Sequence, residues 1–386
     1  MVIDTLRADH LPFYGYPLRT APNLARLAEE GVLFRRAHST SSYTAPATAS
    51  ILTSLRPSRH GVLVGLWAAA QEQREVDRIA DRVETMAEAF AAAGYTTFAV
   101  TDNVNVSRAA GFDQGFHYFR NLRDRGAEAV NRQVLAWRQE LGAAEPWFLY
   151  LHYMDPHKPY RRREPWYASY RPGGGDWRVA AYDSEIAFVD ARIGELRREL
   201  GWDERTLVVV TSDHGEELMD RTRMGHGQTL YAEVLDVPLV LWGPPGWAGR
   251  REDARVSTLD ILPTLVELLG LRQSPDHEGR SLLAPGERPP ALAHVRKPVP
   301  DRSRELRALI RGDWKLVLHD TGERELYDLA ADPGERSNAA EREPERGAAM
   351  RREIEALGAG PAEAARTRVE ITPELAEHLR SLGYGE

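Results

Sequence analysis

Short apolar runs alternate with amphipathic segments along most of the chain. The apolar runs have the length and β-branched content of buried strands, whereas the amphipathic segments show helical spacing. The predicted strands are 1–3, 96–100, 147–152, 207–211 and 237–241, and the predicted helices are 22–31, 46–55 and 81–93. Strands that alternate with helices predict an α/β fold, in which a mostly parallel sheet is sandwiched by helices.

The pattern changes near Gln273. Residues 307–310, 314–319 and 325–329 alternate like antiparallel strands, whereas the chain beyond 339 is rich in Arg, Glu and Ala, which is typical of a solvated helix and linker. We therefore predict three parts, which are a large α/β domain at 1–275, a small C-terminal antiparallel α+β subdomain at 276–338, and a helical Arg/Glu-rich tail at 339–386.

Composition excludes several classes of protein. The 386 residues include no cysteine, which excludes disulfides, thiolate metal sites and a cysteine nucleophile. A net charge of −8 argues against a non-specific nucleic-acid binder. No apolar run approaches the roughly 20 residues of a membrane span. The sequence leaves the oligomeric state open.

Asp, Asn and His come directly after four of the predicted strands. Asp4 follows the first strand, Asp102 and Asn103 the second, the segment 152–157 the third, and Asp213 with His214 the fourth. Ligands of such folds bind at the carboxyl ends of the strands. We therefore expect these residues to form one site.

Asp213 and His214 are the first candidates for metal ligands. A carboxylate beside a neutral imidazole can bind one divalent metal ion. The alternative is that Asp213 caps a helix and His214 is a surface residue. The presence of Asp4 at another strand end, and of His226 nearby in the sequence, favours the metal site.

Thr44 precedes the predicted helix that begins near Pro46. A helix N-terminus holds anions, and a hydroxyl that touches a metal there can become a nucleophile. The alternative is that Thr44 only caps the helix. His152 and His157 lie outside any aliphatic pattern in a Pro-containing segment, so we interpret them as site residues, and we predict that His152 and Asn103 contact the substrate.

A series of short motifs, taken in order, resembles the sulfatase family of the alkaline-phosphatase superfamily. The resemblance covers nearly the whole chain. The motifs include Asp4-Thr-Leu-Arg-Ala-Asp9-His10, Pro22-Asn23-Leu24, His60-Gly61-Val62, His152-Tyr-Met-Asp155-Pro-His157, Thr211-Ser-Asp213-His214-Gly215-Glu216, Gly225-His226-Gly227, Trp314-Lys315-Leu316, Glu325-Leu326-Tyr327-Asp328-Leu329 and the ending Leu379-Arg-Ser-Leu-Gly-Tyr384.

The resemblance implies a catalytic domain of alkaline-phosphatase-like fold followed by a small antiparallel sheet with a helix. It also implies a metal bound by Asp4, Asp213, His214 and the hydroxyl of Thr44. His157 and His226 would line the anion site and serve the leaving group or the non-bridging oxygens. The ligands suit one Ca²⁺, Mn²⁺ or Mg²⁺ ion, with Zn²⁺ as a further option.

The departures from the family pattern concern the nucleophile. Family sulfatases make formylglycine from Cys or Ser within Cys/Ser-x-Pro-x-Arg, whereas this chain reads Thr44-Ala-Pro-Ala-Thr48. Thr5 also stands where sulfatases often place a second metal-binding Asp. Thr nucleophiles occur in the superfamily among phosphodiesterases and among transferases of phospho-head-groups.

We therefore interpret the chain as a metal-dependent hydrolase or transferase of phosphate or phosphonate esters, with in-line attack by Thr44. Its substrate would be a small-molecule, glycan or lipid ester. The alternatives are a sulfuric ester hydrolase that works without formylglycine, and a catalytically degenerate member that binds an anion.

Localisation stays open at this stage. The chain shows no signal peptide, because Asp4 and Arg7 interrupt its apolar opening, and as it stands it is expected to be cytoplasmic. The first predicted strand is shorter than the usual ~5–6 residues. We therefore expect the true N-terminus to lie upstream, which leaves export open as the alternative.

Overall fold

The computed structural model describes residues 1–66, 75–170, 174–243, 247–297, 304–358 and 366–370. Its centre is an eight-stranded sheet with the strand order β11-β2-β10-β7-β1-β6-β4-β5. The strands are β1 (Val2–Ile3), β2 (Val32–His38), β4 (Thr96–Thr101), β5 (Tyr118–Asn121), β6 (Trp147–Tyr153), β7 (Val208–Thr211), β10 (Asp236–Trp242) and β11 (Arg250–Ser257). All neighbours are parallel except β10, which runs antiparallel to both β2 and β7.

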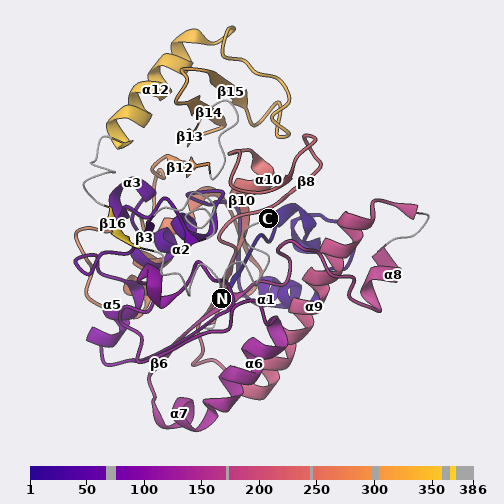
Figure 1. Cartoon of the computed structure of the whole chain (residues 1–386), viewed down its shortest axis with the longest axis vertical. Coiled ribbons are helices and arrows are strands. Elements are labelled where there is room, and N and C mark those ends of the chain that lie inside the picture. Colours follow the sequence, from indigo (N-terminus) through magenta and orange to yellow (C-terminus); the bar gives the residue numbers. More distant parts are fainter. Residues whose placement is uncertain (67–74, 171–173, 244–246, 298–303, 359–365, 371–386) are drawn as a thin grey trace.

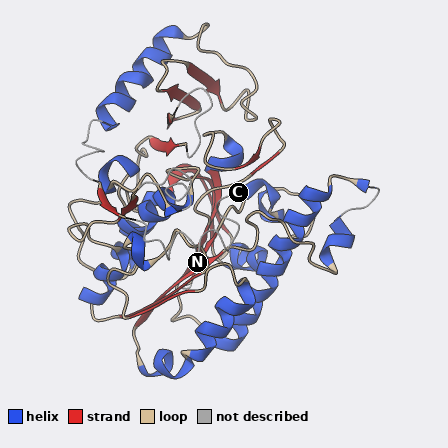
Figure 2. Ribbon diagram, viewed as in Figure 1, coloured by secondary structure: helices blue, strands red, loops and turns tan. Residues whose placement is uncertain are grey.

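Helices cover both faces of this sheet (Figures 1 and 2). One face packs against α2 (Thr44–Thr53), α5 (Met86–Ala92) and α11 (Ile261–Leu268). The other packs against α1 (Pro22–Glu30), α6 (Ala127–Ala136) and α9 (Trp177–Leu200). Because apolar side chains are buried on both faces, the central strands read as nearly continuous apolar runs.

Shorter elements complete this layer. They are η1 (Ala8–His10), η2 (Pro12–Tyr14), α3 (Pro57–His60), η3 (Arg108–Ala110), α7 (Arg138–Ala143), α8 (Trp166–Tyr170), β8 (Glu217–Leu218), β9 (Met224–Gly225), α10 (Ala232–Leu235) and η5 (Thr258–Asp260).

A second, antiparallel sheet lies at the top of Figure 1. It contains β12 (Ala291–Arg296), β13 (Glu305–Arg311), β14 (Trp314–His319) and β15 (Arg324–Asp328), in that order. The helix α12 (Pro344–Gly358) buries Met350 and Ile354 in the core of this sheet. Further along, β16 (Thr367–Val369) pairs with β3 (Val76–Arg78) of the large domain.

The predicted fold class is confirmed, whereas the boundaries of the three parts stay a prediction. The contacts of α12 and β16 cross those boundaries, so the segment predicted as a solvated tail carries one buried helical face. The predicted ending 379–384 lies outside the described residues.

Two helix starts differ from the prediction. The helix expected at 81–93 begins only at Met86, because the Thr85 side chain and Glu88 form a capping box there. The helix expected from residue 46 begins at Thr44, so Thr44 is its first residue and Tyr43 is the N-cap.

Several elements were not predicted. The strand β11 is an exposed edge with five charged residues (Arg250, Arg251, Glu252, Asp253 and Arg255), so it lacks the apolar pattern of a strand. The helix α9 buries Asp183, Glu185 and Asp190, which hides its apolar period. The strands β2 and β5 and the helix α8 were also missed.

Candidate active site

The four polar strand ends meet at one edge of the central sheet. Asp4 follows β1, Asn103 follows β4, His152 lies near the end of β6, and Asp213 follows β7. The neighbouring order β7-β1-β6-β4 places these four strands side by side. The parallel topology therefore brings the residues together, as the sequence predicted.

Asp4 is fully buried, and only one of its carboxylate oxygens has a hydrogen-bond partner. Asn103 Nδ2 donates to Asp4 Oδ2 at 2.5 Å, and His152 Nε2 lies 3.2 Å from the same oxygen. The Tyr150 hydroxyl lies 3.0 Å from His152 Nδ1 and can donate to it, which leaves Nε2–H to donate to Asp4. Asp4 Oδ1 has no partner in the described structure.

Burial by itself would raise the pKa of Asp4. The hydrogen bond from His152 and the nearby histidines outweigh that effect and hold the pKa of Asp4 below its ordinary value. Asp4 is therefore a carboxylate at neutral pH.

Asp213 and His214 face Asp4 from the end of β7. Burial, followed by the repulsion of the Asp4 carboxylate, raises the pKa of Asp213 well above its ordinary value. Asp213 Oδ2, like Asp4 Oδ1, is buried without a partner. Two buried carboxylates that repel one another and each leave one oxygen unpaired need a positive charge between them.

His214 is held in the tautomer that a metal ligand requires. Its Nδ1 lies 2.9 Å from the Gly215 carbonyl, which can only accept, so Nδ1 carries the proton and Nε2 carries the lone pair. Nε2 lies 3.8 Å from Asp4 Oδ1 and 3.5 Å from Asp213 Oδ2. Burial, and then the neighbouring His226, lower the pKa of His214 to about 3, so the ring is neutral.

Thr44 completes this group from the N-terminus of α2. Its Oγ1 lies 3.2 Å from His214 Nε2, and the side chain is buried. Because Nε2 carries the lone pair, the Thr44 hydroxyl donates to it. Thr44 and Ala45, the first two residues of α2, have backbone N–H groups that make no hydrogen bond within the helix.

The donor set fits a divalent metal ion. Asp4, His152 and Asp213 have side-chain atoms that all lie within 4.8 Å of one another, with His152 holding Asp4 through Nε2–H. His214 Nε2, which carries a lone pair, lies within 3.8 Å of the two unpaired carboxylate oxygens. Two carboxylates, imidazole nitrogen and a hydroxyl are ligands that Ca²⁺, Mn²⁺, Mg²⁺ or Zn²⁺ accept.

His226 and His157 line the outer side of this group. The ring of His226 lies 4.4 Å from that of His214 and 5.0 Å from that of His157, measured between centroids. His226 Nδ1 lies 2.9 Å from Glu216 Oε1, which orients the ring. Burial lowers the pKa of His226 to about 4 and raises that of Glu216 to about 7.

The structure brings together the predicted catalytic, substrate and metal residues, which are Asp4, Thr44, Asn103, His152, His157, Asp213, His214 and His226. Asp102 and Asp155, which were expected at the same site, instead accept from backbone N–H groups of residues 125–127 at the start of α6. Asn103 and His152 contact Asp4 and orient its carboxylate. Their contact with the substrate stays a prediction. Tyr150 and Glu216 were missed. Tyr150 lies two residues before His152 on β6, and this spacing places both side chains on one face of the strand.

The comparisons with known proteins agree with this geometry. A family model described as Sulfatase matches residues 1–271. The chain belongs to the sulfatase family. The predicted enzyme class, an ester hydrolase of this family, is thereby confirmed.

Individual relatives are distant but cover most of the chain. A sulfatase of Formosa agariphila is 24% identical over 418 residues, which span 88% of this chain and 82% of that protein. The solved phosphonate monoester hydrolase of Agrobacterium radiobacter has a TM-score of 0.71 and 20% identity, and the match covers 97% of each chain. The structure of BT4656 with its substrate D-glucosamine-2-N,6-O-disulfate has a TM-score of 0.75 and 18% identity, and covers 94% of this chain and 98% of that chain.

The two solved structures share the sulfatase fold with this chain. One of them is a phosphonate monoester hydrolase, and the other holds a sulfated sugar as its substrate, so the fold alone leaves the substrate class open. Among the described helices, none combines the length and the apolar character needed to cross a membrane.

Proposed function

We propose that this sulfatase-family chain hydrolyses phosphate or phosphonate esters with a divalent metal ion, and that Thr44 is the nucleophile. The observation that carries the proposal is the position of Thr44, because its buried hydroxyl lies at a helix N-terminus against His214 and next to two unpaired carboxylate oxygens. Thr44 occupies the place of the convertible Cys or Ser, and the chain contains no cysteine.

Each of the described site residues has a separate role in the proposed reaction. Thr44 Oγ1 attacks phosphorus in line with the leaving alcohol, and the N–H groups at the start of α2 stabilise charge on the equatorial oxygens. A bound divalent cation would lower the pKa of the Thr44 hydroxyl and neutralise the charge that develops on the substrate. Asn103 and His152 hold Asp4 in place through its Oδ2 oxygen.

His226 and His157 line the outer side of the site, where a neutral His226 ring can take up the proton that Thr44 loses. His226 Nδ1 faces Glu216, and His157 Nδ1 lies 2.5 Å from the Lys158 carbonyl, so each ring keeps its Nε2 for other partners. As the bond from phosphorus to Thr44 forms, the bond from phosphorus to the alcohol oxygen breaks, and the proton released by Thr44 passes through the imidazole ring to the leaving alcohol. Water then attacks the phosphoryl-threonine, which releases phosphate or phosphonate and restores the hydroxyl.

A second candidate is a sulfuric ester hydrolase that uses Thr44 in the same way. It is supported by the family itself and by the sulfated substrate of BT4656. Formylglycine enzymes release sulfate by elimination from an aldehyde hydrate, which a threonine cannot do. Sulfate transferred to Thr44 would have to be removed by water, and for this reason we favour the phosphorus esters.

The test compares 4-nitrophenyl esters of phosphate, phenylphosphonate and sulfate, and bis(4-nitrophenyl) phosphate, each with Mn²⁺, Ca²⁺, Mg²⁺ and Zn²⁺. We expect turnover of phosphorus esters. Turnover of the sulfate ester alone would overturn the proposed substrate class.

Variants of the helix α2 test the nucleophile. Thr44→Val keeps the shape of the side chain and should abolish turnover, whereas Thr53→Val, at the other end of the same helix, should not. A phosphoryl group trapped on Thr44 and detected by mass spectrometry would support the covalent step. Full activity of Thr44→Val would exclude it.

A further inference from the structure

Two buried histidines each approach one oxygen of Asp4. His152 Nε2 lies 3.2 Å from Asp4 Oδ2, and His214 Nε2 lies 3.8 Å from Asp4 Oδ1. Both rings are fully buried. Distance alone would make either histidine a metal ligand, so the position of the ring proton decides which of them can bind a cation.

The partner of each Nδ1 atom fixes that proton. His214 Nδ1 faces the Gly215 carbonyl, which only accepts, so His214 keeps a lone pair on Nε2. His152 Nδ1 lies 3.0 Å from the Tyr150 hydroxyl instead. A hydroxyl can donate or accept, so this contact by itself allows two arrangements of the His152 ring.

The carboxylate of Asp4 selects one of these arrangements. If His152 Nδ1 donated to Tyr150, the lone pair of Nε2 would face Asp4 Oδ2 at 3.2 Å, and two buried acceptors would be in contact without a proton between them. If the Tyr150 hydroxyl donates to Nδ1, Nε2–H donates to Asp4 and each group has a partner. Burial, and then the charges of Asp213 and Asp4, raise the pKa of Tyr150 well above its ordinary value, so the hydroxyl keeps the proton that it donates.

We propose that Tyr150 is a positioning residue of the metal site, and that its hydroxyl holds His152 as a hydrogen-bond donor to Asp4 rather than as a ligand of the metal. Asp4 Oδ2 then accepts from both His152 and Asn103, which leaves Asp4 Oδ1 for the cation. The inference rests on the divalent metal of the proposed function, but not on which ester is hydrolysed.

The atoms that remain for the cation belong to the other residues of the site. His214 Nε2 lies 3.8 Å from Asp4 Oδ1 and 3.5 Å from Asp213 Oδ2, and neither oxygen has a partner in the described structure. These two oxygens can bind a cation without losing a hydrogen bond. A cation bound by His152 Nε2, in contrast, would replace the hydrogen bond from His152 to Asp4.

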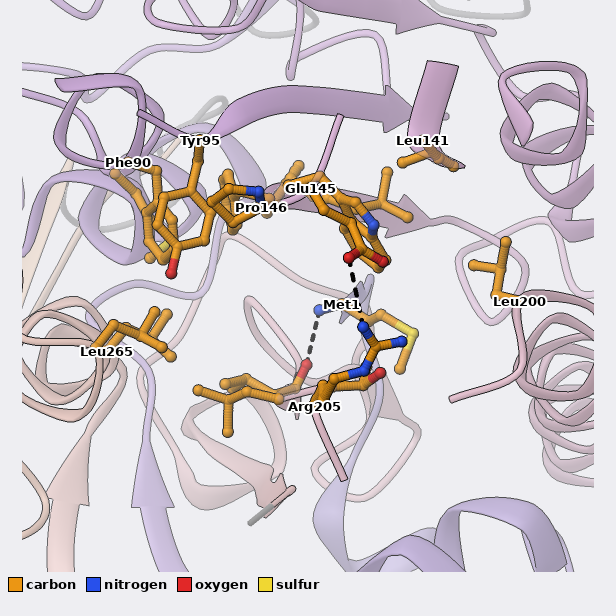
Figure 3. Close-up of a pocket in the computed structure, with 18 of the residues that line it drawn as sticks. Met1, Phe90, Tyr95, Leu141, Glu145, Pro146, Leu200, Arg205 and Leu265 are labelled. Atoms are coloured by element: carbon orange, nitrogen blue, oxygen red, sulfur yellow. Dashed lines mark hydrogen bonds and ion pairs between the residues drawn. The ribbon is translucent and has the colours of Figure 1, made fainter. Parts of the chain in front are cut away.

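The ring of Tyr150 packs in the apolar core on the α2 and α5 face, in the same cluster as Phe90 and Leu265. Figure 3 shows these two residues on one side of a cavity of about 750 Å³, which Tyr150 also lines. The charged residues Glu145 and Arg205 pair with each other at 3.4 Å in another part of the same cavity. The change Tyr150→Phe therefore keeps the ring in apolar surroundings and removes only the hydroxyl.

Binding of Mn²⁺ to the full-length protein, measured by titration calorimetry without substrate, tests the role of Tyr150. Tyr150→Phe should raise the Kd about tenfold, since loss of a residue that orients a metal ligand costs roughly 10–100-fold in affinity. The matched control is Tyr153→Phe on the same strand, which removes a buried hydrogen bond of 2.9 Å to Asn131 on the opposite face of the sheet. Its Kd should equal that of the wild type, and equal Kd values for the two variants would overturn the proposal.

A double variant tests whether Tyr150 acts through His152. His152→Gln alone should weaken Mn²⁺ binding, and the further change Tyr150→Phe should then raise the Kd by less than about twofold, because the hydroxyl has no imidazole left to hold. A full tenfold effect of Tyr150→Phe in the His152→Gln background would contradict a role through His152.

The tautomer of His152 can be measured directly in the metal-free protein. Two-bond proton–nitrogen correlation spectra of isotope-labelled histidine distinguish a proton on Nε2 from one on Nδ1, and the signal of His152 is the one that His152→Gln lacks. We expect the proton on Nε2 in the wild type and in Tyr153→Phe, and a changed Nδ1 signal in Tyr150→Phe. A proton on Nδ1 of His152 in the wild type would overturn the proposal even if Tyr150→Phe failed to fold. None of these readouts depends on catalysis, so failure of the proposed ester hydrolysis would leave the result unaffected.

Discussion

A buried ion pair connects the small sheet to the segment that carries His226, and its removal gives the sharpest test of the structure. Lys315 Nζ on β14 donates to Glu335 Oε1 at 2.7 Å, and both side chains are about 1% exposed. Glu335 also accepts from the backbone N–H of Ala232, at the start of α10, at 3.0 Å. The change Lys315→Met keeps an unbranched side chain that is one atom shorter, and removes the charge.

The expected loss is about 3 kcal/mol in the free energy of unfolding. Removal of one partner of a buried pair costs roughly 3–5 kcal/mol, because the other charge stays buried without compensation. We expect the lower end of this range because Arg221 lies 3.8 Å from Glu335 Oε2 and offers partial compensation. The loss would be a large share of the roughly 5–15 kcal/mol that holds a typical protein folded.

The loss should depend on pH in a defined direction. Burial already raises the pKa of Glu335 above 4.5, and removal of Lys315 raises it further. A carboxyl whose folded pKa is raised binds more protons in the folded state than in the unfolded state, so stability falls as pH increases from about 4.5 towards the folded pKa. The deficit of Lys315→Met should therefore be larger at pH 8 than at pH 5.

Urea denaturation of the wild type, Lys315→Met, Glu335→Gln and the double variant measures the coupling between the two residues. The double variant should be more stable than the sum of the two single losses predicts. A Lys315→Met variant within about 1 kcal/mol of the wild type at pH 8, or strictly additive losses, would refute the reasoning.

Three further predictions concern the metal site, pH and local stability. Removal of divalent metal with EDTA should lower the melting temperature of the wild type. Mn²⁺ at a hundred times its Kd should then raise the free energy of unfolding by about 2.7 kcal/mol. The stability of Asp213→Asn should change with neither treatment. Glu217 is buried, and burial raises its pKa to about 7. The wild type should therefore lose up to about 1.4 kcal/mol of stability per pH unit as the pH rises from about 4.5 to 7. Glu217→Gln lacks this loss, so its melting temperature relative to the wild type should be higher at pH 8 than at pH 5. Thr85→Ala should cost about 1 kcal/mol in urea denaturation, because it removes the cap of α5. A change at exposed Asp81, which lies outside the cap, should cost little.

The sequence predicted the residues of the site better than the elements around it. Asp4, Asn103 and Asp213 could be grouped because each follows an apolar run, and parallel strands end at one edge. The tautomer of His214 could not be predicted, because it depends on the carbonyl that the folded loop places beside Nδ1. His226 was assigned only by resemblance, since it comes from the β8–β9 hairpin and follows no strand of the central sheet.

The missed elements have a common physical cause. The strand β11 is charged because it lies at the edge of the sheet, where side chains are exposed and charge discourages further pairing. The helix α9 was not predicted because its buried face carries polar side chains, which form hydrogen bonds with other elements of the fold. Asp190, for example, accepts from Leu24 N at 2.8 Å. Periodicity cannot distinguish a buried polar residue with a partner from an exposed one.

The charges in the site lead to a final prediction about substrate choice. Asp4 and Asp213 together would cancel the charge of one divalent cation, and His214 is neutral. His226, with a pKa lowered to about 4 by burial, is also neutral at pH 7. The inner site thus offers little net positive charge, which favours a singly charged ester over a doubly charged one.

We therefore expect phosphonate monoesters and phosphodiesters, which carry one negative charge, to be hydrolysed with a higher kcat/KM at pH 8 than phosphate monoesters, which carry two. The second ionisation of a phosphate monoester has a pKa of about 6, so its disadvantage should narrow at pH 5, where it carries one charge. The kcat/KM ratio of 4-nitrophenyl phenylphosphonate to 4-nitrophenyl phosphate at the two pH values measures this effect. A ratio that favours the phosphate monoester at pH 8, or that does not change with pH, would show that positive charge from outside the inner site, such as exposed Lys158, governs recognition instead.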